Sequence, residues 1–451
     1  MEQRSGFGLV LASSCLAMLA VGANSTAIMA ALPAMRAELS LSPGGVQWAV
    51  NAYLVVSAAF IVLGGQAADR FGARHAALAG LALFALASCI IATAGMQAVL
   101  LAGRGLQGLA AAFAVPCTLA AVNTAAPPER RAGAIGAWTG FLMLGFSIGP
   151  LLGGALTHFA SWRAIFWLNL LLMLTASLGL VVAGGAAAHA AGGPSRRTDW
   201  AGFVLLAVFM VALVFGLHAL PEVRTAPLAA AGPFALAAVA LGLLLRVEAR
   251  KDAPLLDLDF FTRREFVMGV AIGALAMFSI MSLLLYYNLF AQSPAGLGLT
   301  ALAAGASLLP LSATQLALAL SAAAVAARLG RRNAMTGGMV LVAIGCAVVG
   351  VATAKHDLVL LAVGFAVLGA GLAVPYALAP RLALSALVPA QTGQGSGIVN
   401  ACTFLGGSAG VAGGATAFAL GGFSAVLVMI GVAGLLGAVL SRGITEAEPA
   451  D

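Results

Sequence analysis

Arg104 is the one strongly ionisable side chain that lies well inside a long apolar run of this sequence, and Gln107 follows it one helical turn later. If this run crosses a membrane, an arginine near its centre costs roughly 2.5–3.5 kcal/mol on insertion scales, so it should face a cavity or backbone carbonyl groups. From there the guanidinium could polarise a binding site or bind an anionic group. The alternative is a structural arginine that ties its helix to its neighbours.

Uncharged polar side chains occur at similar depth in other apolar runs. With Arg104, the candidates for lining a substrate cavity are Gln107, Asn24, Thr26, Tyr287, Gln315 and Asn400. Each needs a hydrogen-bond partner in apolar surroundings, so it either lines a cavity or bonds to another helix. All fifteen carboxylates lie in connectors, tails or span ends. This argues against strict selection for cationic compounds, because a buried acid is their ordinary partner.

The sequence offers no catalytic centre. It contains no His-Glu-x-x-His motif, no paired carboxylates within an apolar run and no Gly-x-x-x-x-Gly-Lys-Ser/Thr phosphate loop. The five cysteines lie singly in apolar runs, without metal or disulfide spacing. We therefore expect neither enzyme activity nor a metal site, no cofactor, and no direct use of ATP.

Composition identifies the elements that must position these side chains. The chain has 451 residues, 62% of them apolar and only 8% charged, which predicts an all-α integral membrane protein. At about 20 residues per crossing, we predict fourteen transmembrane helices. They lie near 8–34, 46–67, 77–95, 97–122, 133–156, 164–184, 201–220, 228–247, 265–289, 299–326, 334–354, 357–379, 394–418 and 422–441.

Lysines and arginines are sorted unequally between the connectors. An even number of spans puts both termini on one side, and that side holds sixteen of these cations against four on the other. Because the cation-rich side of a membrane protein faces the cytoplasm, we expect cytoplasmic termini and a bilayer partner. The formal net charge of +7 therefore reflects topology and does not indicate nucleic-acid binding.

A charged, glycine-punctuated turn from Gly65 to His75 returns in altered form at 327–333. The candidate conformational switch comprises Gly65, Asp69, Arg70, Gly72, Arg74, Arg328, Gly330 and Arg332. Asp69 with the two nearby arginines could form a cytoplasmic charge lock. The alternative is a solvated turn, and the second copy has Ala327 in place of the acid.

A second stretch is also repeated: the run from Gly145 to Gly154 in the fifth span is matched by 406–414 in the thirteenth. Its candidate residues are Gly145, Gly149, Pro150, Gly153 and Gly154. Proline removes a backbone donor and glycine permits close helix contact, so the stretch is either a hinge or a packing seam. The repeats predict two parallel six-helix halves, 1–190 and 264–451, with two inserted helices in 191–263.

These residues resemble motifs of the major facilitator superfamily, and within it the fourteen-span drug:proton antiporter branch of multidrug exporters. The turn at Asp69 resembles the signature between the second and third helices, Arg104 and Gln107 the fourth-helix motif, and the glycine-rich run the fifth-helix motif typical of antiporters. The resemblance implies a carrier in a cell's inner membrane. It would export small, largely hydrophobic compounds by alternating access, coupled to protons.

The chain departs from that branch at Asn24, where the branch usually has an aspartate. An amide cannot take up a proton near neutral pH, so the coupling role does not carry over to this position. Uptake or facilitated transport of a neutral or anionic metabolite is the alternative, favoured by Arg104 and Asn24 and disfavoured by the fifth-helix motif. Composition also fits a structural or sensory protein, which would not explain the repeated turn. The oligomeric state is left open, with a monomer compatible.

Overall fold

The structure, a computed structural model, describes residues 2–184, 199–220, 227–251, 257–388 and 391–445. Within these ranges the regular structure is helical, without strands. The chain divides into two compact units. The first comprises Met1–Thr198 with Thr300–Gly305, and the second Asp199–Leu299 with Ala306–Asp451.

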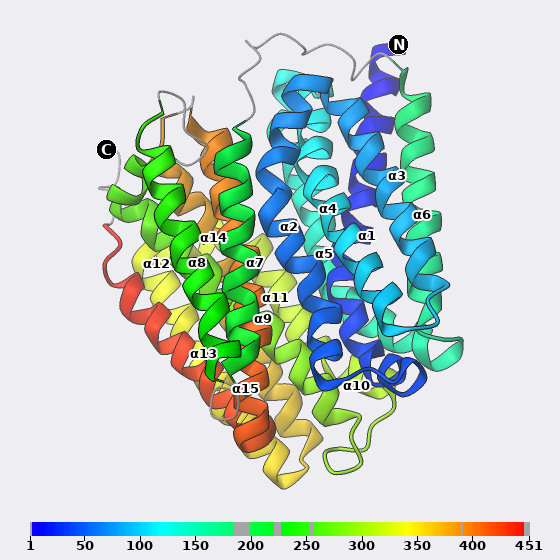
Figure 1. Cartoon of the computed structure of the whole chain (residues 1–451), viewed down its shortest axis with the longest axis vertical. Coiled ribbons are helices and arrows are strands. Elements are labelled where there is room, and N and C mark those ends of the chain that lie inside the picture. The colour runs from blue at the N-terminus through cyan, green and yellow to red at the C-terminus, as the bar shows by residue number, and fades with distance from the viewer. Residues whose placement is uncertain (1, 185–198, 221–226, 252–256, 389–390, 446–451) are drawn as a thin grey trace. The chain divides into compact units, whose positions relative to one another are not determined.

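The first unit contains the first six predicted spans (Figure 1). They are α1 (Glu2–Leu39), α2 (Pro43–Phe71), α3 (Ala73–Ala92), α4 (Gln97–Ala125), α5 (Arg131–Phe159) and α6 (Arg163–Val182), with a short 3-10 helix, η1, at Pro128–Arg130. Local sequence sets their ends. Ser42 caps α2 by accepting a hydrogen bond from the Gly45 amide at 2.9 Å, and proline follows it at the first helical position.

The second unit contains the remaining spans (Figure 1). They are α7 (Trp200–Ala219), α8 (Pro227–Glu248), α9 (Arg264–Ala291), α10 (Ala301–Ser307), α11 (Leu309–Leu320), α12 (Ala322–Leu329), α13 (Arg331–Lys355), α14 (Leu358–Ser385) and α15 (Thr392–Ser441), preceded at α9 by η4 (Leu258–Thr262). The predicted span 299–326 is interrupted, because the helix breaks at Leu308 and Ser321. The first five residues of α10 group with the first unit.

The last helix, α15, accounts for two predicted spans. Its 50 residues would measure about 75 Å as a straight helix, far more than the ~30 Å hydrocarbon core. Gly421 and Gly422 have non-helical dihedral angles, and Gly422 has a φ of 63°, so the chain bends there. The described ranges hold thirteen helices long and apolar enough to span a membrane. With α15 counted twice, this confirms the all-α fold with fourteen spans.

The same pattern of helix pairs recurs in both units. In the first unit α1 packs on α5, α2 on α4, and α3 on both α4 and α6. In the second, α9 packs on α15, α11 on α14, and α13 on both α14 and α15. Close approach through glycine also recurs: Gly80 lies against the α4 backbone at Ala114, and Gly338 against Pro375 of α14. Each unit is therefore built on one repeated six-helix plan.

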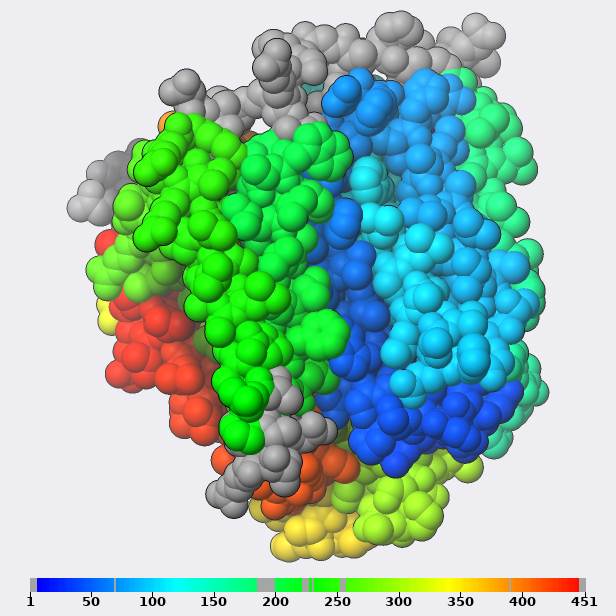
Figure 2. Space-filling model, viewed as in Figure 1, coloured from blue at the N-terminus to red at the C-terminus, as the bar shows by residue number. Residues whose placement is uncertain are grey.

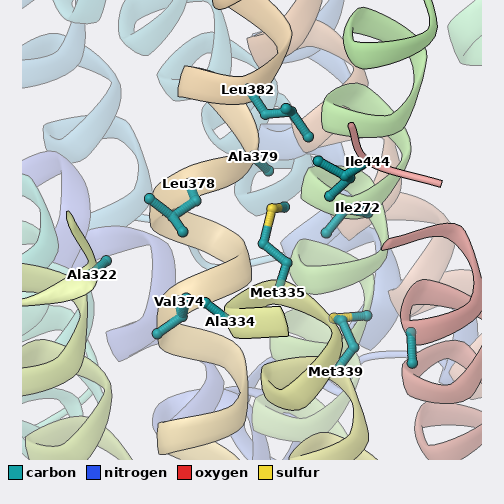
Figure 3. Close-up of a cluster of buried hydrophobic side chains, with 11 residues drawn as sticks. Ile272, Ala322, Ala334, Met335, Met339, Val374, Leu378, Ala379, Leu382 and Ile444 are labelled. Atoms are coloured by element: carbon teal, nitrogen blue, oxygen red, sulfur yellow. The ribbon is translucent and has the colours of Figure 1, made fainter. Parts of the chain in front are cut away.

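An apolar cluster fills part of the second unit and joins five of its helices. Figure 3 shows Met335 of α13 between Ile272 of α9 and the side of α14 that carries Leu378, with Met339 further along α13. All of these side chains are at most 6% exposed. Large apolar side chains elsewhere point outward, as expected for a surface that faces lipid.

The inserted helices α7 and α8 form a hairpin that groups with the second unit, where α7 packs against α15. Figure 2 shows the two helices side by side at the surface. Much of α8 is exposed, including Leu228 at 86%. The domain limits predicted at 190 and 263 stay predictions, and residue 190 lies outside the described residues.

Candidate functional site

Arg104 of α4 is completely buried and its guanidinium is held on three sides. Nε donates to the Ala49 carbonyl oxygen of α2 at 2.7 Å, and Nη1 donates to Gln107 Oε1 at 2.7 Å. The guanidinium carbon lies 4.6 Å from the centre of the Tyr53 ring, a cation–π distance. Nη2 is buried without a hydrogen-bond partner. The side chain thus makes the interhelical contacts of a structural arginine and still has one donor available.

Gln107 extends this arrangement to a third helix. It is fully buried, and its Nε2 donates to Ser88 Oγ of α3 at 2.9 Å. Ser88 in turn donates to the Phe84 carbonyl oxygen at 2.7 Å. Because Gln107 is held from α3, its Oε1 is fixed where the Arg104 guanidinium needs an acceptor.

Asn24 lies in the same unit on α1 and is also fully buried. Its Oδ1 accepts a hydrogen bond from Asn169 Nδ2 of α6 at 2.8 Å, while its own Nδ2 has no partner. The next residue, Ser25, lies 3.3 Å from the Tyr53 hydroxyl. Ser25 thus connects α1 to the Tyr53 ring that lies against Arg104, whereas the side chain of Asn24 contacts α6.

Thr26 has an interhelical role in the structure. Its hydroxyl donates to the Phe146 carbonyl oxygen of α5 at 3.1 Å. This bond lies in the seam between α1 and α5. Of the three uncharged candidates in the first unit, Gln107 bonds to Arg104, whereas Asn24 and Thr26 each tie α1 to another helix.

The other three candidates belong to the second unit. Tyr287 is fully buried on α9, and its hydroxyl lies 2.5 Å from Ser307 Oγ. Asn400 bonds to its own helix, donating to the Ser396 carbonyl oxygen at 2.9 Å. Gln315 is half-buried on α11. Their participation in substrate binding stays a prediction.

Tyr287 is part of an aromatic cluster that sequence reasoning missed. Its ring centre lies 4.8 Å from Phe365 of α14 and 5.8 Å from Phe423 of α15, and Phe290 stacks on Phe423 at 5.2 Å. These rings come from three helices that are far apart in the sequence. Only their contacts in the folded unit reveal the cluster.

The two copies of the glycine-punctuated turn have the same backbone geometry. Gly72 has a φ of 83° and Gly330 a φ of 81°, the left-handed region that glycine adopts without strain. Each glycine is the single residue between two consecutive helices. The turn thus needs glycine at these positions, as the repeat indicates.

Among the charged residues of the turn, Arg74 bonds to the end of α6. Nε donates to the Leu180 carbonyl oxygen at 3.0 Å and Nη2 to that of Val181 at 2.8 Å. Cations are favoured at helix C-termini. Arg70, Arg328 and Arg332 are exposed. The side chain of Asp69 lies outside the described part of the chain, so the charge lock stays a prediction.

The glycine-rich run of α5 packs directly on α1. A Cβ atom at Gly145 would overlap the Leu19 carbonyl oxygen, and one at Gly153 would overlap the backbone of Ala27. The space at Gly149 is taken by Thr26 Oγ1, and that at Gly154 by the Ala301 carbonyl of the same unit. We call this contact the α1–α5 seam. Pro150 is buried within α5, which continues through it as a helix.

The second unit has a matching seam between α9 and α15. Gly406 lies against the Ala274 carbonyl oxygen and Gly410 against that of Phe278. Both repeated glycine runs therefore bring two helix backbones into direct contact, as the packing interpretation of the run requires.

A polar clasp at the far end of α1 was not predicted. The Trp162 indole donates to Glu38 Oε2 at 2.6 Å, and Arg163 forms an ion pair with the same carboxylate. Arg163 also donates to the Ala94 carbonyl oxygen at 2.9 Å. The ends of α1, α3 and α6 are thereby joined.

A second clasp closes the base of the α7–α8 hairpin. Asp199 caps α7 by accepting from the Gly202 amide at 2.9 Å and forms an ion pair with Lys251. Lys251 also pairs with the buried carboxylate of Glu248 at 3.4 Å. Burial alone would raise the pKa of Asp199, but its hydrogen bonds to Lys251, Gly202 and Glu248 hold that pKa below the ordinary value. Burial would lower the pKa of Lys251, and Asp199 and Glu248 raise it above the ordinary value.

Repeated six-helix units, fourteen apolar spans and a buried polar network define a multi-pass helical carrier. Residues 14–314 match the family model described as Major Facilitator Superfamily. The chain belongs to this superfamily and is a membrane transporter of small molecules.

Relatives match along most of the chain. It is 31% identical over 405 residues to the tetracenomycin C resistance and export protein of Streptomyces glaucescens, covering 89% of this chain and 74% of that protein. It is 31% identical to the cephamycin export protein CmcT of Amycolatopsis lactamdurans, covering 90% and 83%. Among solved structures, an auto-inhibited POT family peptide transporter matches with a TM-score of 0.71 and 14% identity over 99% of this chain and 98% of that one. That structural likeness concerns the fold.

Proposed function

We propose that this chain exports small, largely hydrophobic compounds from the cytoplasm, in the manner of an antibiotic or multidrug efflux carrier. The observation that carries the proposal is its likeness, over about nine-tenths of its length, to relatives named as exporters of tetracenomycin C and cephamycin. The α1–α5 seam supports it, because the run that forms the seam resembles the fifth-helix motif typical of antiporters.

Transport proceeds by alternating access, in which the two six-helix repeats move relative to each other. Each repeat keeps its own glycine seam and so moves largely as a body. The repeated turns at Gly72 and Gly330 join the second and third helices of each repeat and act as the conformational switch, with the charge lock at Asp69 on one side only.

Protons drive the cycle in this proposal, but not through position 24. Asn24 is an amide and bonds to Asn169. The proton is therefore carried by another group in this proposal. We propose that the protein lies in the cell's inner membrane with both termini in the cytoplasm and that it is not an enzyme.

Export can be tested with inside-out vesicles that contain the purified chain and carry an imposed pH gradient. A panel of antibiotics is offered outside the vesicles, and accumulation inside them is measured. We expect uptake into these vesicles for at least some apolar compounds, and its collapse when an ionophore dissipates the gradient. Movement only in the opposite sense would favour the uptake alternative, and accumulation that ignores the ionophore would reject proton coupling.

A further inference from the structure

The positive charge of Arg104 has no carboxylate partner among the described side chains of the first unit. None of the three ion pairs in the described residues includes it. Glu38 pairs with Arg163 at the end of α1, and Glu129 is exposed in η1. The backbone of Asp69 lies over four helical turns beyond Tyr53 on α2. Among the described side chains of the first unit, this completely buried cation thus has no counter-charge.

Two buried donors of the first unit, one on α4 and one on α1, also have no acceptor. They are Nη2 of Arg104 and Nδ2 of Asn24. The remaining nitrogens of the guanidinium are committed to Ala49 and Gln107, and the Asn24 oxygen to Asn169. A buried cation and two unused donors demand acceptors and one negative charge, which a carboxylate or another monovalent anion supplies.

We propose that the network around Arg104 is an anion site and that the preferred cargo is an apolar compound bearing one acidic group. Arg104 Nη2 binds the acidic group, and Tyr53 and Gln107 hold the guanidinium in place. Asn24 sets the specificity, because an amide leaves the cation free to pair with cargo. Arg104 has no exposed surface, so the anion reaches it when the helices part during the transport cycle. The claim about cargo rests on the proposed export function, whereas the claim about binding does not.

Three probes that share one apolar body and differ in charge test the site: pyrenebutyric acid, pyrenebutyramide and pyrenebutylamine. Binding to the purified full chain in detergent is measured by energy transfer from tryptophan to pyrene. We expect the acid to bind at least about tenfold more tightly than the amide or the amine. Equal affinity for the acid and the amide would overturn the proposal.

Variants assign the preference to its residues. Arg104→Gln should weaken binding of the acid by about tenfold or more and leave the amide unchanged. Asn24→Asp supplies an internal counter-charge. It should weaken binding of the acid and strengthen binding of the amine. Arg104→Lys keeps the charge and should keep the preference for the acid. If Arg104→Gln does not fold, Arg104→Lys and Asn24→Asp together test the assignment. Unchanged binding of the acid in both Asn24→Asp and Arg104→Gln would overturn the assignment.

The anion has two sources to distinguish: the acidic group of the cargo and a free inorganic anion. Binding of pyrenebutyric acid is measured in chloride and in gluconate. If chloride competes with the acid in the wild type and not in Arg104→Gln, the site binds free anions as well as cargo. If chloride has no effect on binding of the acid, the site binds only the acidic group of the cargo. Export of the amide without preference for the acid would overturn the anion site and leave export standing. Arg104-dependent binding without outward transport would do the reverse.

Discussion

At the scale of single residues, the central feature is how the hydrogen-bond donors of one buried guanidinium find their partners. Arg104 contacts the α2 backbone, the amide of Gln107 and the ring of Tyr53. These contacts offset a burial cost of roughly 2.5–3.5 kcal/mol, and no acid among the described side chains of the first unit takes part. The arginine is therefore structural through two nitrogens and free to bind through the third.

Arg104→Ala should reduce export to below about a tenth of the wild-type rate, a loss of ~1.4 kcal/mol or more. Its removal deletes the anion-binding nitrogen and leaves the Gln107 oxygen without its donor. Export into inside-out vesicles measures the effect, and size-exclusion chromatography of a fluorescent fusion checks that the variant is inserted and folded. Near-normal export by a folded variant would reject a central role for this residue.

Asn24→Asp should make export pH-dependent. Below the pKa of the new acid the carboxyl group is neutral, so the anion site behaves as in the wild type. Above that pKa the carboxylate neutralises Arg104, so export of an acidic compound falls as the pH rises and that of a cationic compound increases. Export of both probes is measured across the pH range, and a profile identical to the wild type would show that position 24 does not act on the site.

At the scale of helices, glycine residues set how closely neighbouring helices approach. The α1–α5 and α9–α15 seams place backbones in contact, because lipid supplies no hydrophobic drive for helices to associate and small residues allow close van der Waals contact instead. The α7–α8 hairpin is different, with a largely exposed apolar surface and a polar clasp at its base.

Gly145→Ala should destabilise the protein by about 1–3 kcal/mol, because the added methyl group overlaps the α1 backbone, which cannot rotate away. Gly140→Ala on the same helix is the matched control. A Cβ there has no neighbour within 4 Å, so stability should stay the same or rise by up to about 1 kcal/mol. Thermal unfolding in detergent compares the two, and similar midpoints would exclude a tight seam at Gly145.

Lys251→Met should give the hairpin a stability that falls as the pH rises. In the wild type, Asp199 has a lowered pKa, so its stabilising effect is lost only in acid below its ordinary value of about 3.9, and Lys251 has a raised pKa, so its effect is lost only above about 10.4. Between these limits the clasp is constant. Without the lysine, Asp199 and Glu248 are two neighbouring acids, at least one of which must stay protonated.

Limited proteolysis of the α7–α8 connector at pH 5 and at pH 9 measures this effect. The two values are about four pH units apart, and both lie inside the wild-type limits. Lys355→Met is the control, since that lysine is exposed at the end of α13. If resistance to proteolysis is independent of pH in both variants, the clasp does not hold the hairpin.

At the scale of the whole chain, the two units repeat one plan of helix pairs, and the repeat predicts which ends share a compartment. Cysteines placed at Arg130 and Arg332 should react with a membrane-impermeant maleimide only after the cells are opened. Cysteines at Ser161 and His356 should react in intact cells. The measurement uses a background without native cysteines. Labelling of Arg130 and Arg332 from opposite sides would contradict the parallel repeat.

How much of this could be predicted depends on whether a feature is local. The spans follow from long apolar runs, and the pairing of Arg104 with Gln107 follows from their spacing of one helical turn. The breaks at Leu308 and Ser321 were not predicted. Neither were the bonds to Ser88 and Asn169, because they depend on the rotation and offset of one helix against another, which no local pattern specifies.

The way the hairpin is fastened suggests how this protein came to have fourteen helices. Within the second unit it packs on α15 through α7, and the ion pairs of Asp199, Glu248 and Lys251 that close its base lie within the hairpin itself. A twelve-helix ancestor could therefore have gained such a passenger in one step.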